Sequence, residues 1–333
     1  MRILITGING FIGSHFLEYA LSHTDWDIVG VDLVDDNIRD YESRFEFHRL
    51  DIRSDVAAIE DLLRGADVVM LLAGVARPAE YVAHPMHVFE LDFEYNLTYV
   101  RMCARYGKRL IFPSTSEVYG IGGEEPMNEW KSNLVTGPVH EMRWIYSASK
   151  QLMDRVIFAL AQEEGLRFSI IRPFNWVGPR LDSFALAQKR EARVLTQMLY
   201  DMIYNQRIIL AGDGTQRRSF TYVGDGIEAL ARIIDAEEQA NGKIFNIGNH
   251  DNNYSVKELA DLLLERAQNF APLADYARRT VVEIQSYTSL FGDRYADTHN
   301  RIPDISTIEN LLSWHPHTTM EEILDSMLQW VAE

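Results

Sequence analysis

Short apolar runs rich in Val, Ile and Leu alternate with amphipathic helical patterns through the first half of the chain. Runs of this length and composition are typical of strands buried in a sheet. The predicted strands are residues 2–6, 27–32, 45–50, 68–72, 109–113 and 168–172. The predicted helices between them include residues 13–22, 88–106 and 148–164. This alternation predicts an α/β fold with a doubly wound parallel sheet and helices on both of its faces.

The pattern changes after Pro173, where loops and helices dominate. One further strand is predicted at residues 242–249, and the predicted helices are residues 191–204, 221–236, 254–266 and 318–331. We therefore expect a smaller C-terminal, substrate-binding domain that is built from two separate segments. The predicted division gives residues 1–174 and 221–248 to the sheet domain, and residues 175–220 and 249–333 to the smaller domain.

A glycine-rich turn follows the first predicted strand directly. The turn and the start of the next helical pattern contain Gly7, Gly10, Phe11, Ile12 and Gly13. Residues without a Cβ let backbone amides approach a pyrophosphate, and the N-terminus of the following helix attracts the same anion. A glycine triplet alone also occurs in ordinary strand-to-helix turns. Here the strand before it and the helix after it favour a dinucleotide-binding (Rossmann) turn.

An acidic residue, Asp32, ends the second predicted strand. A carboxylate at this position can accept hydrogen bonds from both ribose hydroxyls of adenosine and would repel a 2′-phosphate. Asp32 therefore predicts NAD as the cofactor rather than NADP, bound by the sheet domain.

Composition excludes several other classes of protein. The chain has 333 residues with 47% hydrophobic content, enough for a full core, and no apolar run of membrane-spanning length. It begins with a core strand instead of a signal peptide, so we expect a soluble, cytoplasmic protein. The single cysteine, Cys103, excludes an internal disulfide framework and a cysteine-rich zinc site, and we predict no metal.

The charge of the chain narrows the choice of partner. A net charge of −17 argues against nucleic acid or an anionic membrane. An anionic small-molecule substrate would then require locally gathered bases. Such bases occur at Lys189, Arg190, Arg193, Arg217 and Arg218, and solvated surface charge is the alternative for each.

A tyrosine and a lysine four residues apart, Tyr146 and Lys150, are predicted to share one face of a helix. An ammonium group beside a phenol lowers the phenol pKa from about 10 and makes a base. Such a base can take a hydroxyl proton while a hydride leaves the same carbon for NAD. The spacing alone is common, but it occurs here with a hydroxyl-rich turn, residues 114–119, directly after a predicted strand.

These features together resemble the extended short-chain dehydrogenase/reductase superfamily, which contains sugar-nucleotide epimerases, dehydratases and decarboxylases. The resemblance covers essentially the whole chain. Four segments are most similar to the UDP-glucuronate decarboxylases, notably the decarboxylase domain of the bifunctional polymyxin-resistance enzyme. They are PSTSEVYG (113–120), RWIYSASKQLMDRVI (143–157), RPFNWVGPRLD (172–182) and HNRIPDI (299–305).

The resemblance implies a mechanism and a role for each matched residue. NAD would oxidise C4 of UDP-glucuronate, with Thr115 and Tyr146 at the 4-hydroxyl, and the carboxylate β to the new ketone would leave as carbon dioxide. Ser116 and Glu117 would lie near C5 and the carboxylate, which Arg301 would orient. Whether Glu117 carries a proton or positions water stays open.

The same resemblance implies binding residues. The cofactor contacts beyond the glycine turn would be Asp51, Ile52, Leu72, Ala73, Tyr146 and Lys150. The nucleotide-sugar contacts would be Tyr81, Asn175, Arg218 and Tyr295. Relatives commonly pair through two helices of each subunit, which would be residues 88–106 and 148–164, so we expect a homodimer at least.

Two departures from the pattern affect the expected substrate. Because the sequence starts at the predicted Rossmann strand, we expect no counterpart of the formyltransferase half of the bifunctional relative, and the resemblance concerns decarboxylation only. Ile209 stands where the family has a lysine that contacts the substrate, with Lys189 and Arg207 nearby, which leaves the nucleotide preference open.

Several functional alternatives remain at this point. The product would be UDP-4-keto-pentose if NADH is released, or UDP-xylose if it reduces the ketone. A 4-epimerase or dehydratase on the same scaffold is a second reading, although dehydratases usually carry Asp-Glu where this chain has Ser116-Glu117. A non-catalytic NAD-sensing protein is a third, but such proteins tend to lose the tyrosine–lysine pair.

Overall fold

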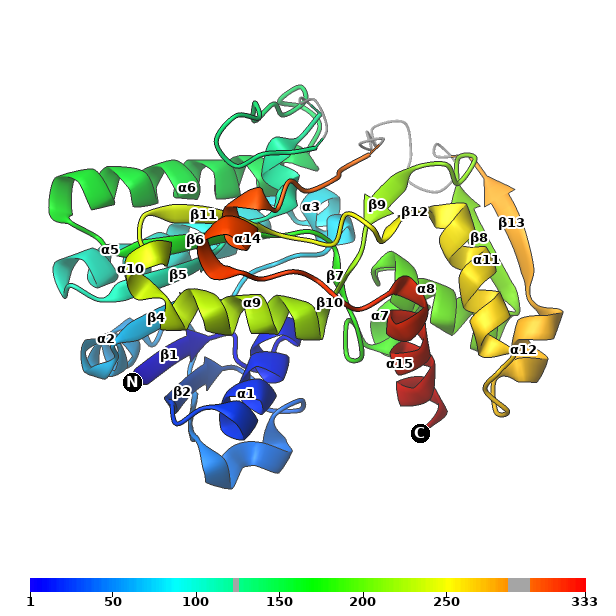
Figure 1. The fold of residues 1–333 in the computed structure, drawn as a ribbon, viewed down its shortest axis with the longest axis horizontal. Coiled ribbons are helices and arrows are strands. Elements are labelled where there is room, and N and C mark those ends of the chain that lie inside the picture. Colours follow the sequence, from blue (N-terminus) through cyan, green and yellow to red (C-terminus); the bar gives the residue numbers. More distant parts are fainter. Residues whose placement is uncertain (122–125, 287–299) are drawn as a thin grey trace.

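The computed structural model describes residues 1–121, 126–286 and 300–333. Its centre is a sheet of seven parallel strands (Figure 1). The strands are β1 (Arg2–Thr6), β2 (Asp27–Asp32), β3 (Glu46–Arg49), β4 (Val68–Leu71), β5 (Arg109–Pro113), β6 (Phe168–Pro173) and β11 (Lys243–Ile247). All seven strands predicted for the sheet are confirmed, and their order is β11-β6-β5-β4-β1-β2-β3. The order reverses between β1 and β4, where doubly wound sheets bind ligands beyond the carboxyl ends of their strands.

Helices cover both faces of this sheet because side chains alternate along each strand. In β1, Ile3 and Ile5 belong to one apolar cluster and Leu4 to the other. The first cluster contains residues of α1 (Phe11–His23), α9 (Val223–Asp235), α10 (Glu237–Ala240) and α14 (Ser306–Leu312). The second contains residues of α2 (Val56–Gly65), α5 (Asn96–Arg105) and α6 (Trp144–Glu164), and Figure 1 shows the two layers.

The helix predicted at residues 88–106 is a composite of three parts. It consists of α4 (Pro85–Phe89), the π-helix η2 (Glu90–Tyr95) and α5. A short π-helical stretch of this kind widens the helix locally, and such stretches are frequent at functional sites. Three short helical elements also belong to this half, namely the α-helix α3 (Pro78–Ala83) and the 3₁₀-helices η1 (Arg39–Arg44) and η3 (Ser116–Tyr119).

The smaller half of the molecule has its own apolar cluster. Its helices are α7 (Phe184–Gln188), α8 (Val194–Tyr200), the π-helix η4 (Asp201–Asn205), α11 (Val256–Ala267), α12 (Ala274–Arg279) and α15 (Met320–Ala332). Ile305, Ile308 and Trp314 lie in the segment that we predicted for this half, but they pack in the α9 layer of the sheet. The exact division into domains stays a prediction.

Three two-stranded sheets were not predicted, because we interpreted most of this region as loops and helices. They pair β7 (Trp176–Val177) with β10 (Thr221–Tyr222), β9 (Arg217–Ser219) with β12 (Asn253–Ser255), and β8 (Arg207–Ala211) with β13 (Val281–Gln285). Consequently α9 begins at Val223, after two strand residues, Thr221 and Tyr222, that we had placed in the helix. These strands are short and their partners lie far away along the chain, so no local pattern marks them.

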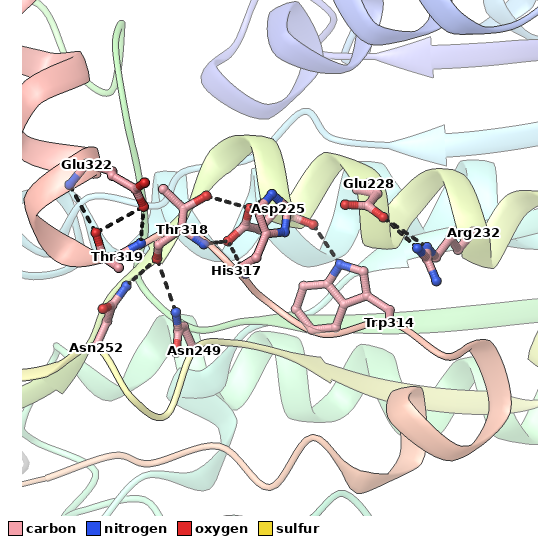
Figure 2. Close-up of polar contacts among 10 residues, drawn as sticks. All are labelled: Asp225, Glu228, Arg232, Asn249, Asn252, Trp314, His317, Thr318, Thr319 and Glu322. Atoms are coloured by element: carbon pink, nitrogen blue, oxygen red, sulfur yellow. Dashed lines mark hydrogen bonds and ion pairs between the residues drawn. The ribbon is translucent and has the colours of Figure 1, made fainter.

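Hydrogen bonds to Asp225 hold the segment before α15 against α9 (Figure 2). Its carboxylate accepts hydrogen bonds from the backbone N–H groups of His317 (3.1 Å) and Thr318 (3.0 Å) and from the Thr318 hydroxyl (2.7 Å). Its carbonyl accepts one from the indole of Trp314 at 3.0 Å. The chain is therefore tied to the sheet domain immediately before it enters α15.

A second set of polar contacts, centred on Arg180 and Glu18, joins the loop after β7 to α1. The Arg180 guanidinium donates to both carboxylate oxygens of Glu18, at 2.7 and 2.9 Å. His15 lies beside this pair and contacts the Pro179 carbonyl at 2.9 Å.

Among the helices of the described residues, none is both long and apolar enough to cross a membrane.

Candidate active site

The glycine turn after β1 has the shape that a pyrophosphate site requires. Gly7 has φ +75°, and a Cβ there would lie 2.6 Å from the backbone N of Ala73. A Cβ on Gly13 would lie 2.5 Å from the Ile8 carbonyl. Gly10 precedes α1 and provides no side-chain cap, and the first turn of α1 contains no acidic residue. The N–H groups of that turn are thus suited to an external anion, which is the role of a bound dinucleotide phosphate.

Asp32 lies at the carboxyl end of β2, close to this turn. It accepts hydrogen bonds from the backbone N–H groups of Asn9 (2.9 Å) and Leu33 (2.7 Å). Burial raises the pKa of Asp32, and these backbone hydrogen bonds oppose the shift. Its place at the strand end fits the recognition of an adenosine ribose.

The other predicted cofactor residues also follow strand ends. Leu72 and Ala73 follow β4 and lie against Gly7. Asp51 and Ile52 follow β3, where the Asp51 carboxylate pairs with Arg53 and the Ile52 carbonyl accepts the Tyr99 hydroxyl at 2.6 Å. The residues predicted to hold NAD therefore surround one edge of the sheet, and their arrangement fits a dinucleotide.

Tyr146 and Lys150 lie on one face of α6, as predicted, and both are buried. Tyr146 is hydrogen-bonded to Thr115, the residue that caps η3. The Lys150 ammonium donates to the Pro113 carbonyl at 2.9 Å and pairs with Asp92 Oδ1 at 3.1 Å. It lies 5.9 Å from the centre of the Tyr146 ring.

The electrostatic balance at Tyr146 differs from our expectation that Lys150 lowers its pKa. Burial raises the pKa of Tyr146 above its ordinary value, and the charges of Asp92 and Glu117 add to the shift. The hydrogen bond with Thr115 acts in the opposite direction. The main reason is burial of the Tyr146 side chain, and the carboxylate nearest to the pair, Asp92, is also the partner of Lys150.

Glu117 is held between two buried arginines. Arg301 Nη1 lies 2.6 Å from one carboxylate oxygen and Arg143 Nη2 lies 3.1 Å from the other. Burial alone would raise the pKa of Glu117, but Arg301 and Arg143 outweigh it, so the pKa lies below its ordinary value. Glu117 is therefore a carboxylate across the neutral range, and its N–H donates to the Thr115 hydroxyl at 3.2 Å.

Arg143 was missed by the sequence reasoning. It stands directly before α6 and contacts the carboxylate oxygen of Glu117 that Arg301 does not. The only signal was its place in the segment 143–157, because a single arginine before a helix is usually surface charge. In the structure its side chain is only 3% exposed.

Two further predicted residues lie beside this group. The ring of Tyr81 stacks on that of Tyr146, with centroids 4.5 Å apart and planes 12° from parallel. Ser116 is buried next to Thr115 at the start of η3. Tyr81 therefore forms one wall of the site and limits how the Tyr146 ring can move.

The remaining predicted substrate residues lie in the smaller half. Asn175 has a left-handed backbone (φ 39°) and donates to the Ser219 carbonyl at 3.0 Å, which ties it to β9. Arg218 lies in β9, and its charge helps to lower the pKa of Glu117. Tyr295 lies outside the described residues, as does His299 of the matched segment 299–305.

The basic residues singled out earlier have different surroundings. Arg193 pairs with Asp182 at 2.9 Å and its guanidinium lies 5.5 Å from the Phe11 ring, beside the glycine turn. Arg190 pairs with buried Asp201 at 2.8 Å. Ile209 lies in β8, where the neighbouring Arg207 pairs with Glu283 of β13 at 3.1 Å.

Within the described ranges, no group of acidic, histidine or cysteine side chains could hold a metal ion.

The fold and this site define an enzyme of the NAD dependent epimerase/dehydratase family, whose model matches residues 3–248. The chain belongs to that family, and its cofactor is NAD. The PbgP3 protein of Burkholderia pseudomallei is 42% identical, with a TM-score of 0.89 over 99% of this chain and 96% of that one.

More distant solved structures share the fold. The UDP-glucose 4-epimerase of Thermotoga maritima is 23% identical, with a TM-score of 0.82 over 99% of this chain and 98% of its own. The UDP-glucuronic acid 4-epimerase of Bacillus cereus, solved with UDP-glucuronic acid and NAD, is 21% identical, with a TM-score of 0.83 over 99% of each chain.

Proposed function

We propose that the protein catalyses the NAD-dependent oxidative decarboxylation of UDP-glucuronate. The observation that carries this proposal is the placement of two buried arginines, Arg143 and Arg301, around Glu117 and next to Thr115 and Tyr146. A substrate carboxylate presented to these guanidinium groups would form strong charge-assisted hydrogen bonds. An epimerase or dehydratase acting on a neutral hexose has no such anion to bind.

The first step is oxidation at C4. Tyr146 accepts the proton of the 4-hydroxyl, Thr115 hydrogen-bonds the same oxygen, and Lys150 holds its charge nearby. NAD⁺, which the glycine turn and Asp32 would hold, would supply the acceptor for the hydride that leaves C4. Because the pKa of Tyr146 is raised in the protein alone, we expect proton transfer to become favourable only once the site is loaded.

The second step breaks the bond between C5 and C6. The two electrons of that bond pass to the enolate that the C4 ketone stabilises, C6 leaves as carbon dioxide, and C5 is then protonated. Arg143 and Arg301 orient the departing carboxylate. Glu117 enters as a carboxylate, because its pKa is lowered, so it positions water or accepts a proton before it can donate one.

Residues 175–220 and 249–333 would bind the nucleotide, with Asn175 and Arg218 at its diphosphate. The product is UDP-4-keto-pentose if NADH leaves, or UDP-xylose if NADH reduces the ketone. The alternative is 4-epimerisation on the same scaffold, which keeps C6.

The test is to incubate the protein with NAD and UDP-glucuronate labelled with ¹³C at C6. NADH absorbance, labelled carbon dioxide and product mass are then followed together. Carbon dioxide with NADH indicates a 4-keto-pentose synthase, and carbon dioxide without NADH indicates a UDP-xylose synthase. Retention of the label overturns decarboxylation of this substrate, and turnover by Tyr146→Phe at the wild-type rate overturns the mechanism.

A further inference from the structure

A buried carboxylate that none of the proposed steps uses lies directly against the catalytic lysine. Asp92 Oδ1 is 3.1 Å from Lys150 Nζ, and the two side chains are 1% and 5% exposed. Asp92 belongs to the π-helix η2, and Lys150 to α6. Pairing one buried charge with another is costly unless both are held in good geometry.

The surroundings of Asp92 hold it in that geometry. Its Oδ2 accepts the N–H of Val75 at 3.0 Å. Gly74 makes room for Oδ1, because a Cβ on Gly74 would lie 2.6 Å from that oxygen. Asn96, one turn further on, donates to the Ala73 carbonyl at 2.9 Å and so ties the helix to the same loop. The π-helix η2 and the loop after β4, which contains Gly74, therefore hold the Asp92 carboxylate in one position.

We propose that Asp92 is a positioning residue that holds the Lys150 ammonium between its own carboxylate and the Pro113 carbonyl, and so sets the pH range in which Tyr146 can act as a base. The proposal rests on the proposed function for the role of Tyr146, but the ion pair itself is independent of the substrate. The charge of Asp92 raises the pKa of Tyr146, so the residue fixes the lysine and at the same time offsets its effect on the phenol.

Other charges also face this group, and they define what the experiment must hold constant. The titratable and charged groups that act on Asp92, Tyr146 or Lys150 are Tyr81, His87, Glu117, Asp154 and Arg193. Replacing Asp92 by Asn removes one negative charge and leaves all of these in place.

The test compares Asp92→Asn with wild type in two measurements. The acid limb of the kcat profile, measured on whichever nucleotide sugar the wild type oxidises, should move down by about one pH unit, because the phenolate is no longer opposed by Asp92. In the enzyme without substrate, acetic anhydride should label Lys150 several-fold faster, since only the neutral amine reacts. An unchanged pH profile with unchanged labelling overturns the proposal.

A matched control separates this role from lost stability. Asp201→Asn also removes a buried carboxylate from a π-helix, η4, where it pairs with Arg190. It should leave the labelling of Lys150 and the position of the pH profile unchanged. If Asp92→Asn does not fold, Gly74→Ala keeps the carboxylate but displaces it, and it should also accelerate the labelling of Lys150.

The labelling result distinguishes the two hypotheses. Faster labelling in a protein that oxidises no nucleotide sugar would support the Asp92–Lys150 pair and overturn the proposed function. If the wild-type protein decarboxylates UDP-glucuronate but Lys150 of Asp92→Asn is labelled at the wild-type rate, the proposed function stands and the role of Asp92 is overturned.

Discussion

The guanidinium of Arg301 lies 2.6 Å from the carboxylate of Glu117, although the two residues are far apart along the chain. Glu117 follows the central strand β5, and Arg301 stands in the segment that returns to the sheet before α14. A substrate carboxylate that binds Arg301 must share this arginine with Glu117 or replace it. The site therefore already contains the type of interaction that we propose for the substrate.

We expect Arg301→Gln to slow carbon dioxide release more than NADH formation. The variant removes the charge that orients the departing carboxylate but leaves Tyr146 and Thr115 at C4. Loss of such a group costs on the order of 10² to 10³ in rate. Single-turnover measurement of both products checks this, with Arg167→Gln, a half-exposed arginine paired with Glu237, as control. Equal loss in both steps would contradict the assigned role.

Asp32→Asn should weaken the preference for NAD over NADP. The carboxylate would no longer accept two ribose hydroxyls or repel a 2′-phosphate, so the ratio of dissociation constants should fall by about tenfold or more. Titration of the protein with each cofactor, followed by tryptophan fluorescence, measures the ratio. Asp36→Asn is the control, since its side chain is 73% exposed. A ratio equal to that of wild type would show that another group selects the cofactor.

Glu18→Gln should lower the free energy of unfolding at neutral pH but not in strong acid. Burial would raise the pKa of Glu18, but hydrogen bonds from His15 and Arg180 lower it to about 2 from 4.5. A carboxyl whose pKa is depressed in the folded state stabilises above pH 4.5, and that contribution is lost as pH falls through about 2.

The expected difference is about 1 to 2 kcal/mol at pH 7, reduced from the full shift because the side chain is partly exposed. Urea unfolding at pH 7 and near pH 3, where part of the contribution is already lost, measures it, with exposed Glu163→Gln as control. A constant difference at both pH values would indicate that the variant acts through packing.

Leu152→Arg should convert a homodimer into monomers. Leu152 lies on α6 and is 46% exposed, and Met86, which precedes the predicted interface helix 88–106 on α4, is 60% exposed, so apolar side chains are exposed at both elements. Light scattering gives the mass of each protein. Leu311→Arg on α14, which is 39% exposed in wild type, is the control and should leave the mass unchanged. A monomeric wild type would contradict the expected dimer.

The sequence was sufficient for the central sheet because most of its strands are largely apolar runs with buried residues on both faces, whereas the edge strand β3 is only partly buried. It was also sufficient to place Gly7, Asp32 and Thr115 at or just beyond the ends of those strands, because parallel strands bring their carboxyl ends to one edge.

The sequence was insufficient where a residue acquires its role from a distant partner. Asp92 stands between Leu91 and Phe93 in an ordinary helical pattern, and only the fold places it at Lys150. Arg143 likewise has no local sign of its contact with Glu117. The paired strands β8 and β13 were missed for the same reason, since neither forms a sheet without the other.

The attachment of the C-terminal segment at Asp225 has a consequence for synthesis of the protein. Met320, Ile323, Leu324, Met327 and Leu328 of α15 complete the apolar cluster of the smaller half. A ribosome makes these residues long after the glycine turn and the central strands. The NAD-binding half can therefore begin to fold on the nascent chain, whereas the half proposed for the nucleotide sugar cannot bury its core until residues 320–332 have emerged.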